Sequence, residues 1–170
     1  MEVVADSAFW TRATELRAHS GTIPADTLEP LFAGRGPPAL RLLDLADNYV
    51  RTAGVERLAA AAWAGSLTWL ALSRNYLDDG ALVALAGGRF GSLRTLHLAH
   101  NNLDQDRSAG EVVTDAGALA LAESASLANL RVLTLSYTGV TDRCVGPLLN
   151  APRWRLSGLG LAGCDLSASP

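Results

Sequence analysis

Aliphatic residues recur along this chain at a fixed spacing that includes one polar position. The spacing is clearest at Leu93, Leu96, Leu98, Asn101 and Leu103. The second and third leucines are two positions apart, so both point to one face of an extended strand, and the residue between them points to the other face. The segment therefore predicts a short strand with one buried face, followed by a turn at the asparagine.

Four more segments repeat this spacing, and a helical pattern follows most of them. The five segments begin at positions 40, 67, 93, 130 and 156, so successive starts differ by 27, 26, 37 and 26. Residues 55–62 and 118–122, which follow Gly54 and Gly117, are rich in the strong helix formers alanine and leucine. Leucines at equivalent helical positions are expected to seal each helix against its strand, namely Leu58, Leu85, Leu121 and Leu148. One strand and one helix cannot bury their apolar faces alone, so we expect the units to stack into one core.

The polar position of the repeat is predicted to hold the turns together. Asn48, Asn75 and Asn101 each lie three positions after the last strand leucine. An amide carries both donor and acceptor atoms, so stacked asparagines can satisfy backbone groups where the chain turns inward. Thr138 and Cys164 occupy this position in the last two segments, so we expect the ladder of amides to end before them.

In this spacing the chain resembles leucine-rich repeat proteins, whose repeats span about 20–29 residues. The long helical half and the usual interval of 26 or 27 are similar to the ribonuclease-inhibitor-like subclass. The resemblance covers residues 40–170. It implies an α/β fold in which a right-handed leucine-rich-repeat solenoid places a curved parallel sheet inside and helices outside. One such scaffold serves many unrelated partners, so the resemblance alone names none of them.

Residues 1–39 are the least regular part of the chain. A helix is expected from Asp6 or Ser7 through Arg17. Counting back one interval of 27 from Leu40 also gives a faint copy of the repeat, at Ala13, Leu16, Ala18, Gly21, Ile23 and Leu31. Terminal repeats are usually atypical, so we interpret this region as a helical N-terminal cap with a degenerate first repeat. Gly34 and Gly36 have neither the lysine nor the spacing of a phosphate-binding loop, so no such loop is predicted.

The third interval is long because it contains an insertion. Subtracting ten from 37 recovers the usual 27, and residues 104–113 are the extra segment. Insertions in solenoids form loops on one face, often the binding face. We therefore expect Asp104, Asp106 and Arg107 to project beside the strands and to contribute to partner specificity.

Composition limits the classes of ligand and the cellular compartment that we expect for this chain. The net charge of −3 provides no general basic surface for nucleic acid. All 14 basic residues are arginine, which together with many alanines suggests a GC-rich, bacterial coding genome. Residues 1–6 do not have the pattern of a signal peptide, and no apolar run is long enough to span a membrane. Cys144 and Cys164 are expected to be buried, reduced thiols, which predicts a cytoplasmic protein.

The residues that could form a metal or catalytic site are better explained as ordinary surface or core residues. His97 and His100 lie near two aspartates, but no second segment fixes a zinc site, so we expect solvent-facing histidines. The segment from Asp104 to Asp115 departs from a calcium loop, with glycine at the seventh position instead of the sixth and Asp instead of Glu at the twelfth. No G-x-S-x-G motif occurs, and no cysteine has an assigned histidine partner. The sequence predicts no metal, no cofactor and no catalysis.

The residues that face outward from the strands suggest a binding surface. Small residues form a shallow lane, with larger polar and aromatic residues beside it: Asp44, Trp69, Arg74, His97, His100 and Tyr137. Trp, Tyr and Arg dominate the binding energy of many interfaces. The plainer alternative is that Trp69 only covers neighbouring side chains, since single exposed apolar residues are common.

These features predict a non-catalytic module that binds a protein partner on the concave strand face. One alternative is a structural or assembly segment with no ligand of its own. Another is the sensing tail of a larger signalling ATPase. A concave face that varies randomly among close relatives would favour the first alternative, and a neighbouring catalytic domain would favour the second.

The last repeat predicts a second interaction surface. Leu156, Leu159 and Leu161 belong to a strand with no charge or proline to discourage pairing with another chain. Stacking covers each repeat from both sides, so an uncapped end exposes apolar surface. Either the natural protein continues beyond Pro170, or this edge pairs with another chain. We expect self-association into a homo-oligomer or capture of a partner at this edge, with a loose, frayed terminus as the alternative.

Overall fold

The computed structural model of the chain describes residues 11–19, 21, 31, 36–101 and 112–167. In these residues six short strands form one parallel sheet, and the order of the strands in the sheet follows the sequence. The strands are β1 (Glu15–Arg17), β2 (Leu42–Asp44), β3 (Trp69–Ala71), β4 (Thr95–His97), β5 (Val132–Thr134) and β6 (Gly158–Gly160). Their order shows an α/β fold built by successive stacking of similar units.

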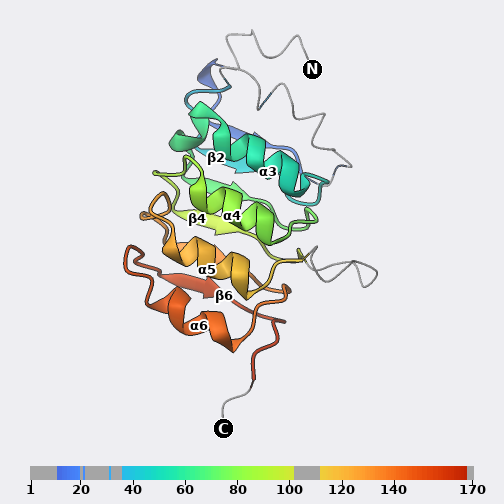
Figure 1. Cartoon of the computed structure of the whole chain (residues 1–170). Helices are drawn as coiled ribbons and strands as arrows, with labels where there is room; N and C mark the ends of the chain where they lie inside the picture. Colours follow the sequence, from blue (N-terminus) through green and yellow to red (C-terminus); the bar gives the residue numbers. More distant parts are fainter. Residues whose placement is uncertain (1–10, 20, 22–30, 32–35, 102–111, 168–170) are drawn as a thin grey trace.

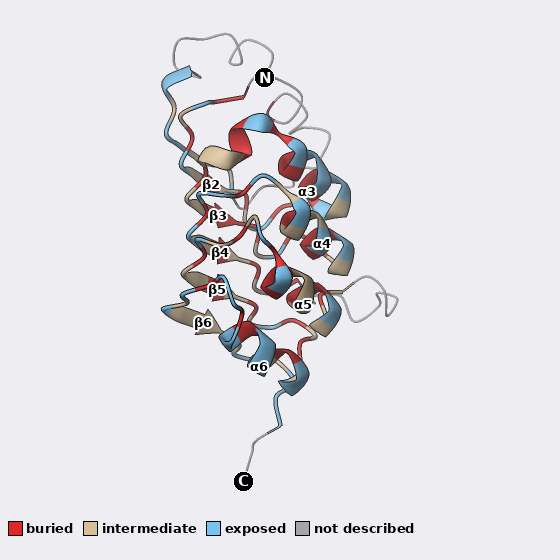
Figure 2. Ribbon diagram, turned by 60° about the vertical axis from the view of Figure 1, so that its left-hand side comes forward, coloured by how far each residue is buried: buried red, intermediate tan, exposed pale blue. Residues whose placement is uncertain are grey.

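Helices cover one face of this sheet and leave the other open (Figures 1 and 2). The helices whose bounds lie within the described residues are α3 (Arg51–Ala60), α4 (Asp79–Gly87), α5 (Asp115–Glu123) and α6 (Asp142–Leu149), and a short 3₁₀ helix, η2 (Ala62–Ser66), follows α3. Each helix lies beside the next, so the described part has a solenoid-like arrangement. None of the described helices has the length and apolar character needed to cross a membrane.

The core lies between the sheet and the helices, and leucines at equivalent positions fill it. Leu16, Leu43, Leu70, Leu96, Leu133 and Leu159 pair in register across the six strands. The four inner ones are fully buried, whereas the outermost two are partly buried. The helical leucines predicted to seal the units are also fully buried, at positions 58, 85, 121 and 148. Each buried leucine contributes about 1.5–3 kcal/mol, so repeated burial is the main stabilising term.

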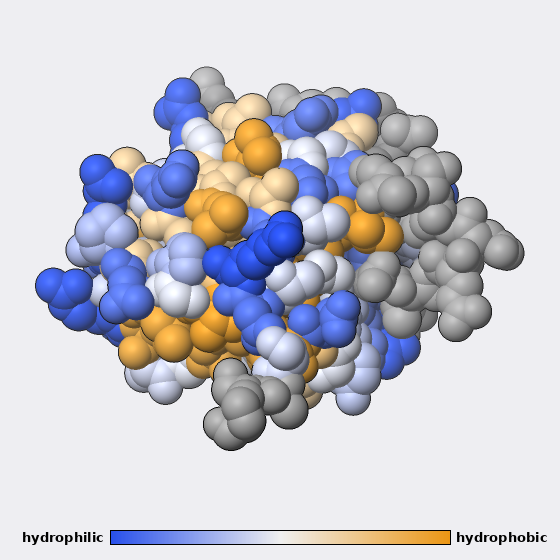
Figure 3. All heavy atoms as spheres, turned by 60° about the horizontal axis from the view of Figure 1, so that its bottom comes forward, coloured by the Kyte–Doolittle hydropathy of each residue, from blue (hydrophilic) through white to orange (hydrophobic). Residues whose placement is uncertain are grey.

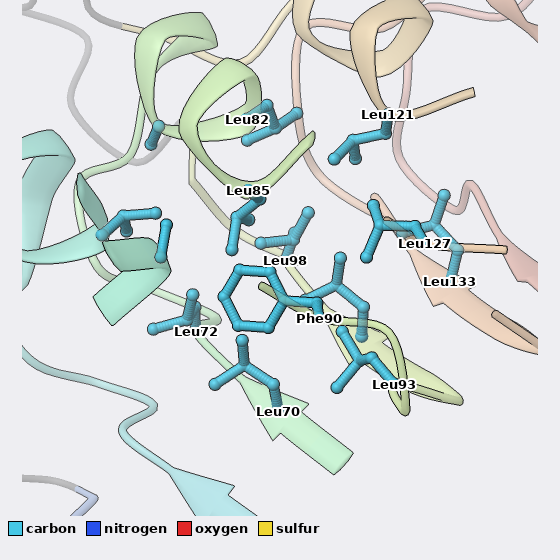
Figure 4. Close-up of a cluster of buried hydrophobic side chains, with 14 of the residues drawn as sticks. Leu70, Leu72, Leu82, Leu85, Phe90, Leu93, Leu98, Leu121, Leu127 and Leu133 are labelled. Carbon is cyan, nitrogen blue, oxygen red and sulfur yellow. The ribbon is translucent and has the colours of Figure 1, made fainter. Parts of the chain in front are cut away.

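Phe90 fills the space between the sheet and the helices in the middle of the core. It is fully buried, and Figure 4 shows its ring surrounded by leucines 70, 72, 85, 93 and 98. The segment that carries it returns from α4 to β4, so the ring also fixes that loop. A planar aromatic here fills volume that two neighbouring units share.

The predicted asparagine ladder is present and is buried. The Asn75 amide nitrogen donates to the Leu45 carbonyl at 2.7 Å, and its Oδ1 accepts from the Val50 backbone at 3.1 Å. Asn101 Oδ1 accepts from the Asn75 backbone at 2.8 Å, so each amide ties its own turn to the preceding one. Asparagine suits this position because it donates and accepts at once.

In the last two units, side chains other than asparagine continue the hydrogen bonds of the ladder. Thr138 Oγ1 donates to the Leu135 carbonyl at 2.6 Å, and Cys164 Sγ donates to the same carbonyl at 3.1 Å. A hydroxyl and a thiol therefore replace the donor role of the amide. They do not replace its acceptor role toward the preceding backbone, because neither accepts from a backbone N–H among the bonds of the described residues.

A second ladder, which the sequence analysis missed, joins the first turns of the helices. Asp79 accepts from the Thr114 backbone at 2.7 Å and from its hydroxyl at 2.6 Å. Asp115 accepts from Thr141 in the same way, at 2.7 and 2.6 Å. Burial raises the pKa of Asp115, but the hydrogen bonds from Thr141 outweigh it and hold that pKa below its ordinary value. The sequence signal for these bonds is the Thr-Asp pair at the starts of α5 and α6, together with the aspartate that begins α4.

The helices begin earlier than predicted. Gly54 and Gly117 were expected to precede helices, but they lie inside α3 and α5. A Cβ on Gly117 would come within 3.0 Å of the Leu82 side chain, so the glycine is needed where α4 and α5 approach closely. Cys144, the buried residue at the equivalent place in α6, shows that the last pair of helices tolerates a side chain there.

The expected helix through Arg17 is wrong at its C-terminal end. Thr11 and Arg12 are helical, but Glu15–Arg17 form strand β1, which pairs with β2 and places Leu16 opposite Leu43. Backbone pairing with a preformed neighbour and burial of Leu16 outweigh the local helical propensity. The register is the one obtained by counting back one repeat interval from Leu43 to Leu16.

Most of the predicted insertion lies outside the described residues, including Asp104, Asp106 and Arg107. Its last residue, Val113, is described. Val113 is fully buried, and its carbonyl accepts from the Gly139 backbone at 2.8 Å. The end of the predicted insertion therefore packs into the core two residues before α5 begins.

The asparagine ladder provides a direct test of the fold. Leucine has a branched shape similar to that of asparagine but no polar atoms, so replacing Asn75 with leucine leaves the buried Val50 N–H without a partner and the Leu45 carbonyl with the Asn48 amide alone. We expect the free energy of unfolding to fall by about 2–4 kcal/mol. Urea unfolding followed by circular dichroism measures this change. The matched control is Asn150→Ala at an exposed helix end, which should cost about 1 kcal/mol or less. Equal losses in the two variants would show that the ladder is not a principal stabilising element.

Candidate interaction surface on the open face of the sheet

Parallel pairing in register arranges the outward side chains of the strands in two columns. The first column is Glu15, Leu42, Trp69, Thr95, Val132 and Gly158. The second column is Arg17, Asp44, Ala71, His97, Thr134 and Gly160. Neighbouring members of a column are about 4.8 Å apart at the backbone, so each large side chain contacts those on the next strand.

Trp69 and His97 form the first contact on this face. Their ring centroids are 5.2 Å apart, and the rings are tilted by 58°. His97 Nδ1 lies 3.0 Å from Thr134 Oγ1, so the imidazole is fixed between β3 and β5. Both rings are partly exposed, which leaves a platform of aromatic surface open to solvent. The surface covers three consecutive strands.

His97 is partly buried, contrary to the expectation of a fully solvent-facing histidine. Burial lowers its pKa from 6.5, although the nearby Asp44 carboxylate opposes this shift. Asp44 itself accepts from the Ala46 backbone at 3.1 Å, and it lies 3.8 Å from the His19 imidazole. Ala71 separates Asp44 from His97 in the second column, so a shallow lane runs between these two side chains.

A third column lies in the turns that follow the strands. It consists of Asp47, Arg74, His100, Tyr137 and Gly163, and all five have positive φ angles between 54° and 67°. The backbone of each non-glycine member donates to the next unit, for example from His100 to Ser136 and from Tyr137 to Ala162, both at 2.8 Å. This conformation costs about 1 kcal/mol for an ordinary residue, and only glycine adopts it freely.

Side chains of this turn column contact one another along its length. Arg74 Nε lies 3.6 Å from Asp47 Oδ1. The His100 and Tyr137 rings stack with centroids 4.2 Å apart and planes 12° apart. The Tyr137 ring lies against Gly163, where any added Cβ would overlap it. Partial burial, helped by the Arg74 charge, lowers the pKa of His100 against the opposing effect of Asp47.

An aromatic pair that the sequence analysis missed extends this edge. Tyr49 and Tyr76 stack with centroids 5.0 Å apart and planes 8° apart. The Arg51 guanidinium lies 6.0 Å from the centre of the Tyr76 ring. The sequence signal was a tyrosine directly after the ladder asparagine in two consecutive units. The described edge of the sheet therefore carries two aromatic stacks.

The structure thus joins the predicted surface residues in pairs. Trp69 contacts His97, His100 stacks on Tyr137, and Arg74 lies against Asp47, while Asp44 acts on His97 through its charge. The pairs occupy consecutive units on one face of the sheet. Small residues at positions 71, 73 and 99 lie among them.

The C-terminal edge exposes apolar surface. Leu156, Leu159 and Leu161 are only partly buried, whereas their counterparts in the preceding unit are fully buried. In the described residues β6 has a neighbouring strand, β5, on one side only. Figure 3 views this end of the molecule and shows hydrophobic residues gathered there.

Metal-ligating side chains do not cluster in the described residues. No three of the His, Cys, Asp or Glu side chains in this part of the chain lie together as a metal site would require. Cys144 is buried, and Cys164 is only partly buried, which corrects the expectation of two buried thiols. Burial and the neighbouring Asp115 raise the pKa of Cys144 to about 12, so this thiol stays protonated.

Comparisons with protein-family models and with curated proteins find no match to this chain. Its function is therefore inferred from the geometry and chemistry of its own surface.

The lowered pKa of His97 predicts a pH dependence of stability. An imidazole whose pKa is depressed in the folded state stabilises the fold above its unfolded pKa of 6.5 and loses this contribution as the pH falls. We expect the melting temperature to fall between about pH 7.5 and roughly pH 5, and His97→Gln to reduce that fall. Differential scanning calorimetry at both pH values measures it. Asn150→Gln, which changes no titratable group at an exposed helix end, is the control and should not reduce it. An unchanged pH dependence in His97→Gln would contradict the assignment.

Proposed function

We propose that this protein is a right-handed leucine-rich-repeat solenoid with an N-terminal cap, which binds a protein partner on its concave strand face without catalysis. Support for the repeat assignment comes from the in-register leucines, the buried asparagine ladder and the single layer of helices. The proposed location is the cytoplasm of a bacterial cell, in keeping with free thiols and arginine as the only strongly basic residue.

The observation that carries the proposal is the turn column. Arg74, His100 and Tyr137 adopt a backbone conformation that disfavours side chains, yet the side chains are large and partly or largely exposed. Glycine or asparagine would fit these turns at lower cost. Strained residues of this kind cluster at functional sites, where the surrounding structure holds them in place. Their side chains are therefore best explained by contacts made to a partner.

The chemistry of the surface suits a protein ligand. The Trp69–His97 platform and the His100–Tyr137 stack offer flat, rigid aromatic surface, which loses little conformational entropy on binding. Asp44, Asp47 and Arg74 add charges of both signs nearby, and these would fix the orientation of a polar segment. Such an interface needs no metal or cofactor.

A second candidate function, assembly, rests on the C-terminal edge. There β6 has one open edge among the described strands, and Leu156, Leu159 and Leu161 are incompletely covered. The occupant we propose is a second copy of this chain, packed about a two-fold axis so that the same leucines meet. This assembly would leave the strand face open for the first function.

Truncating the aromatic surface residues should weaken partner binding. We expect Trp69→Ala and Tyr137→Ala each to weaken binding by about 2 kcal/mol or more, as is usual for central aromatic residues. Both residues lie outside the core, so the circular dichroism spectrum should not change.

Affinity capture with wild-type bait identifies the partner, and calorimetry with the purified partner then measures the variants. Val83→Ala, which changes an exposed residue on α4, is the control from the opposite face. Full affinity in both aromatic variants would locate the binding site elsewhere.

Charge placed on the C-terminal edge should disrupt self-association. Leu159→Arg introduces like charges that would face each other across the proposed two-fold axis, so we expect it to convert a dimer to monomers. Size exclusion with light scattering over micromolar concentrations measures this. Leu149→Arg alters a leucine on α6 that is 62% exposed and serves as the matched control. A wild-type protein that is monomeric throughout this range would contradict the assembly proposal.

A further inference from the structure

A pocket lies at the N-terminal ends of the strands, whereas the aromatic turns follow their C-terminal ends. It has a volume of about 610 Å³ and spans the entries to β2, β3 and β4. Its lining includes Arg41, Thr68 and Arg94, together with Ser66, Ser92 and Asn129. This set is polar and contains no carboxylate.

The register of the sheet creates this pocket. Arg41, Thr68 and Arg94 each directly precede a strand, and backbone bonds align them, since Thr68 donates to the Arg41 carbonyl at 2.8 Å and Arg94 to the Thr68 carbonyl at 2.9 Å. Thr68 is short, whereas its two neighbours are long. Because neighbouring strands are about 4.8 Å apart, the two arginines are about 9–10 Å apart at the backbone, with a gap above Thr68. Such a gap admits one tetrahedral oxyanion between two guanidinium groups.

Small residues keep the approach to this gap open. Two Gly-Ser pairs at equivalent positions, Gly65-Ser66 and Gly91-Ser92, contribute to the lining. A Cβ on Gly91 would meet nothing within 4 Å, which shows that this wall faces open space. The Asn129 amide donates to the Gly91 carbonyl at 2.7 Å and so fixes the loop that carries this pair.

The charge of the pocket is uncompensated. Among the described residues, the ion pairs include none to Arg41 or Arg94. Arg41 Nη1 donates to the Ser66 carbonyl at 3.1 Å, which holds its guanidinium over the pocket. Arg94 is exposed, and none of the hydrogen bonds in this part of the structure involves its guanidinium. Two guanidinium groups therefore face the same space, on a protein whose net charge is −3.

We propose that this pocket binds a phosphate monoester, held between Arg41 and Arg94. Guanidinium groups bind phosphate oxygens through paired, charge-assisted hydrogen bonds. The hydroxyl of Ser92 is placed to supply a further donor, whereas that of Thr68 already donates to the Arg41 carbonyl at 3.2 Å. The volume exceeds that of a bare phosphate and falls in the range of ligand pockets, so the group arrives attached to a larger molecule. The site is separate from the aromatic surface and does not depend on the proposed partner binding.

The test is calorimetric titration of the full chain with inorganic phosphate, a phosphoserine peptide, its unphosphorylated twin and ribose 5-phosphate. We expect phosphate to bind with a Kd of about 1 mM or tighter and to weaken as salt rises. Arg94→Gln should reduce the affinity about tenfold or more, and Thr68→Glu should abolish binding by placing a carboxylate in the gap. Arg143→Gln makes the same charge change on α6 and should bind as the wild type does.

The peptide and sugar titrations distinguish the two sources of the phosphate. Tighter binding of the phosphoserine peptide than of its twin and of ribose 5-phosphate assigns the site to a phosphorylated protein. The reverse order assigns it to a free metabolite. Thermal unfolding of each variant confirms that the fold is retained. The proposal is overturned if the wild type binds none of the phosphate probes, or if Arg94→Gln binds them as tightly as the wild type does.

Discussion

The structure depends on one requirement, which is that the backbone of every inward turn must find hydrogen-bond partners away from water. Asn75 meets this requirement for two units at once. Its amide nitrogen donates to the Leu45 carbonyl of the preceding unit and to the Ser73 carbonyl of its own, while its oxygen accepts from the Val50 backbone. Burial of leucines provides the larger free energy, but it does not specify how one unit sits on the next. The amides do, since a shift of one residue would leave these buried groups unpaired. Sheet register, the columns of outward side chains and the arginine pocket all follow from this alignment.

Much of the fold could be predicted because its determinants are local and periodic. The leucine positions and the parallel strands are repeated in each unit, and the asparagine is repeated in three of them, so one correct interpretation applies to all. Strand β1 was predicted only in part. Counting back one interval placed Leu16 in a faint repeat, but the local pattern was interpreted as a helix, because the pairing with β2 depends on a neighbour distant in sequence. The helix starts were misplaced because Gly117 was interpreted as a boundary, whereas it permits close contact between two helices.

The candidate surfaces were predictable only in part, for a different reason. Composition and spacing identified Trp69 and Tyr137 as outward residues, but not the rings they contact, because stacking depends on side-chain conformation. The arginine pocket was missed because it depends on a short residue. Thr68 belongs to no recognisable motif in the sequence. Only its position between Arg41 and Arg94 in the stacked structure creates a gap. In a repeat protein, the residues that depart from the repeat pattern are the ones that form binding sites. Their role can be inferred only when the side chains on the neighbouring repeats are known.

The left-handed turns also link the evolution of this surface to the stability of the chain. Replacing His100 or Tyr137 with glycine would relieve the backbone and remove the aromatic stack in the same step. Selection for stability alone would therefore steadily erase these side chains. The proposed contacts to a partner would oppose that selection, so the exchange of such residues for glycine in a homologous chain would mark the loss of the proposed interaction.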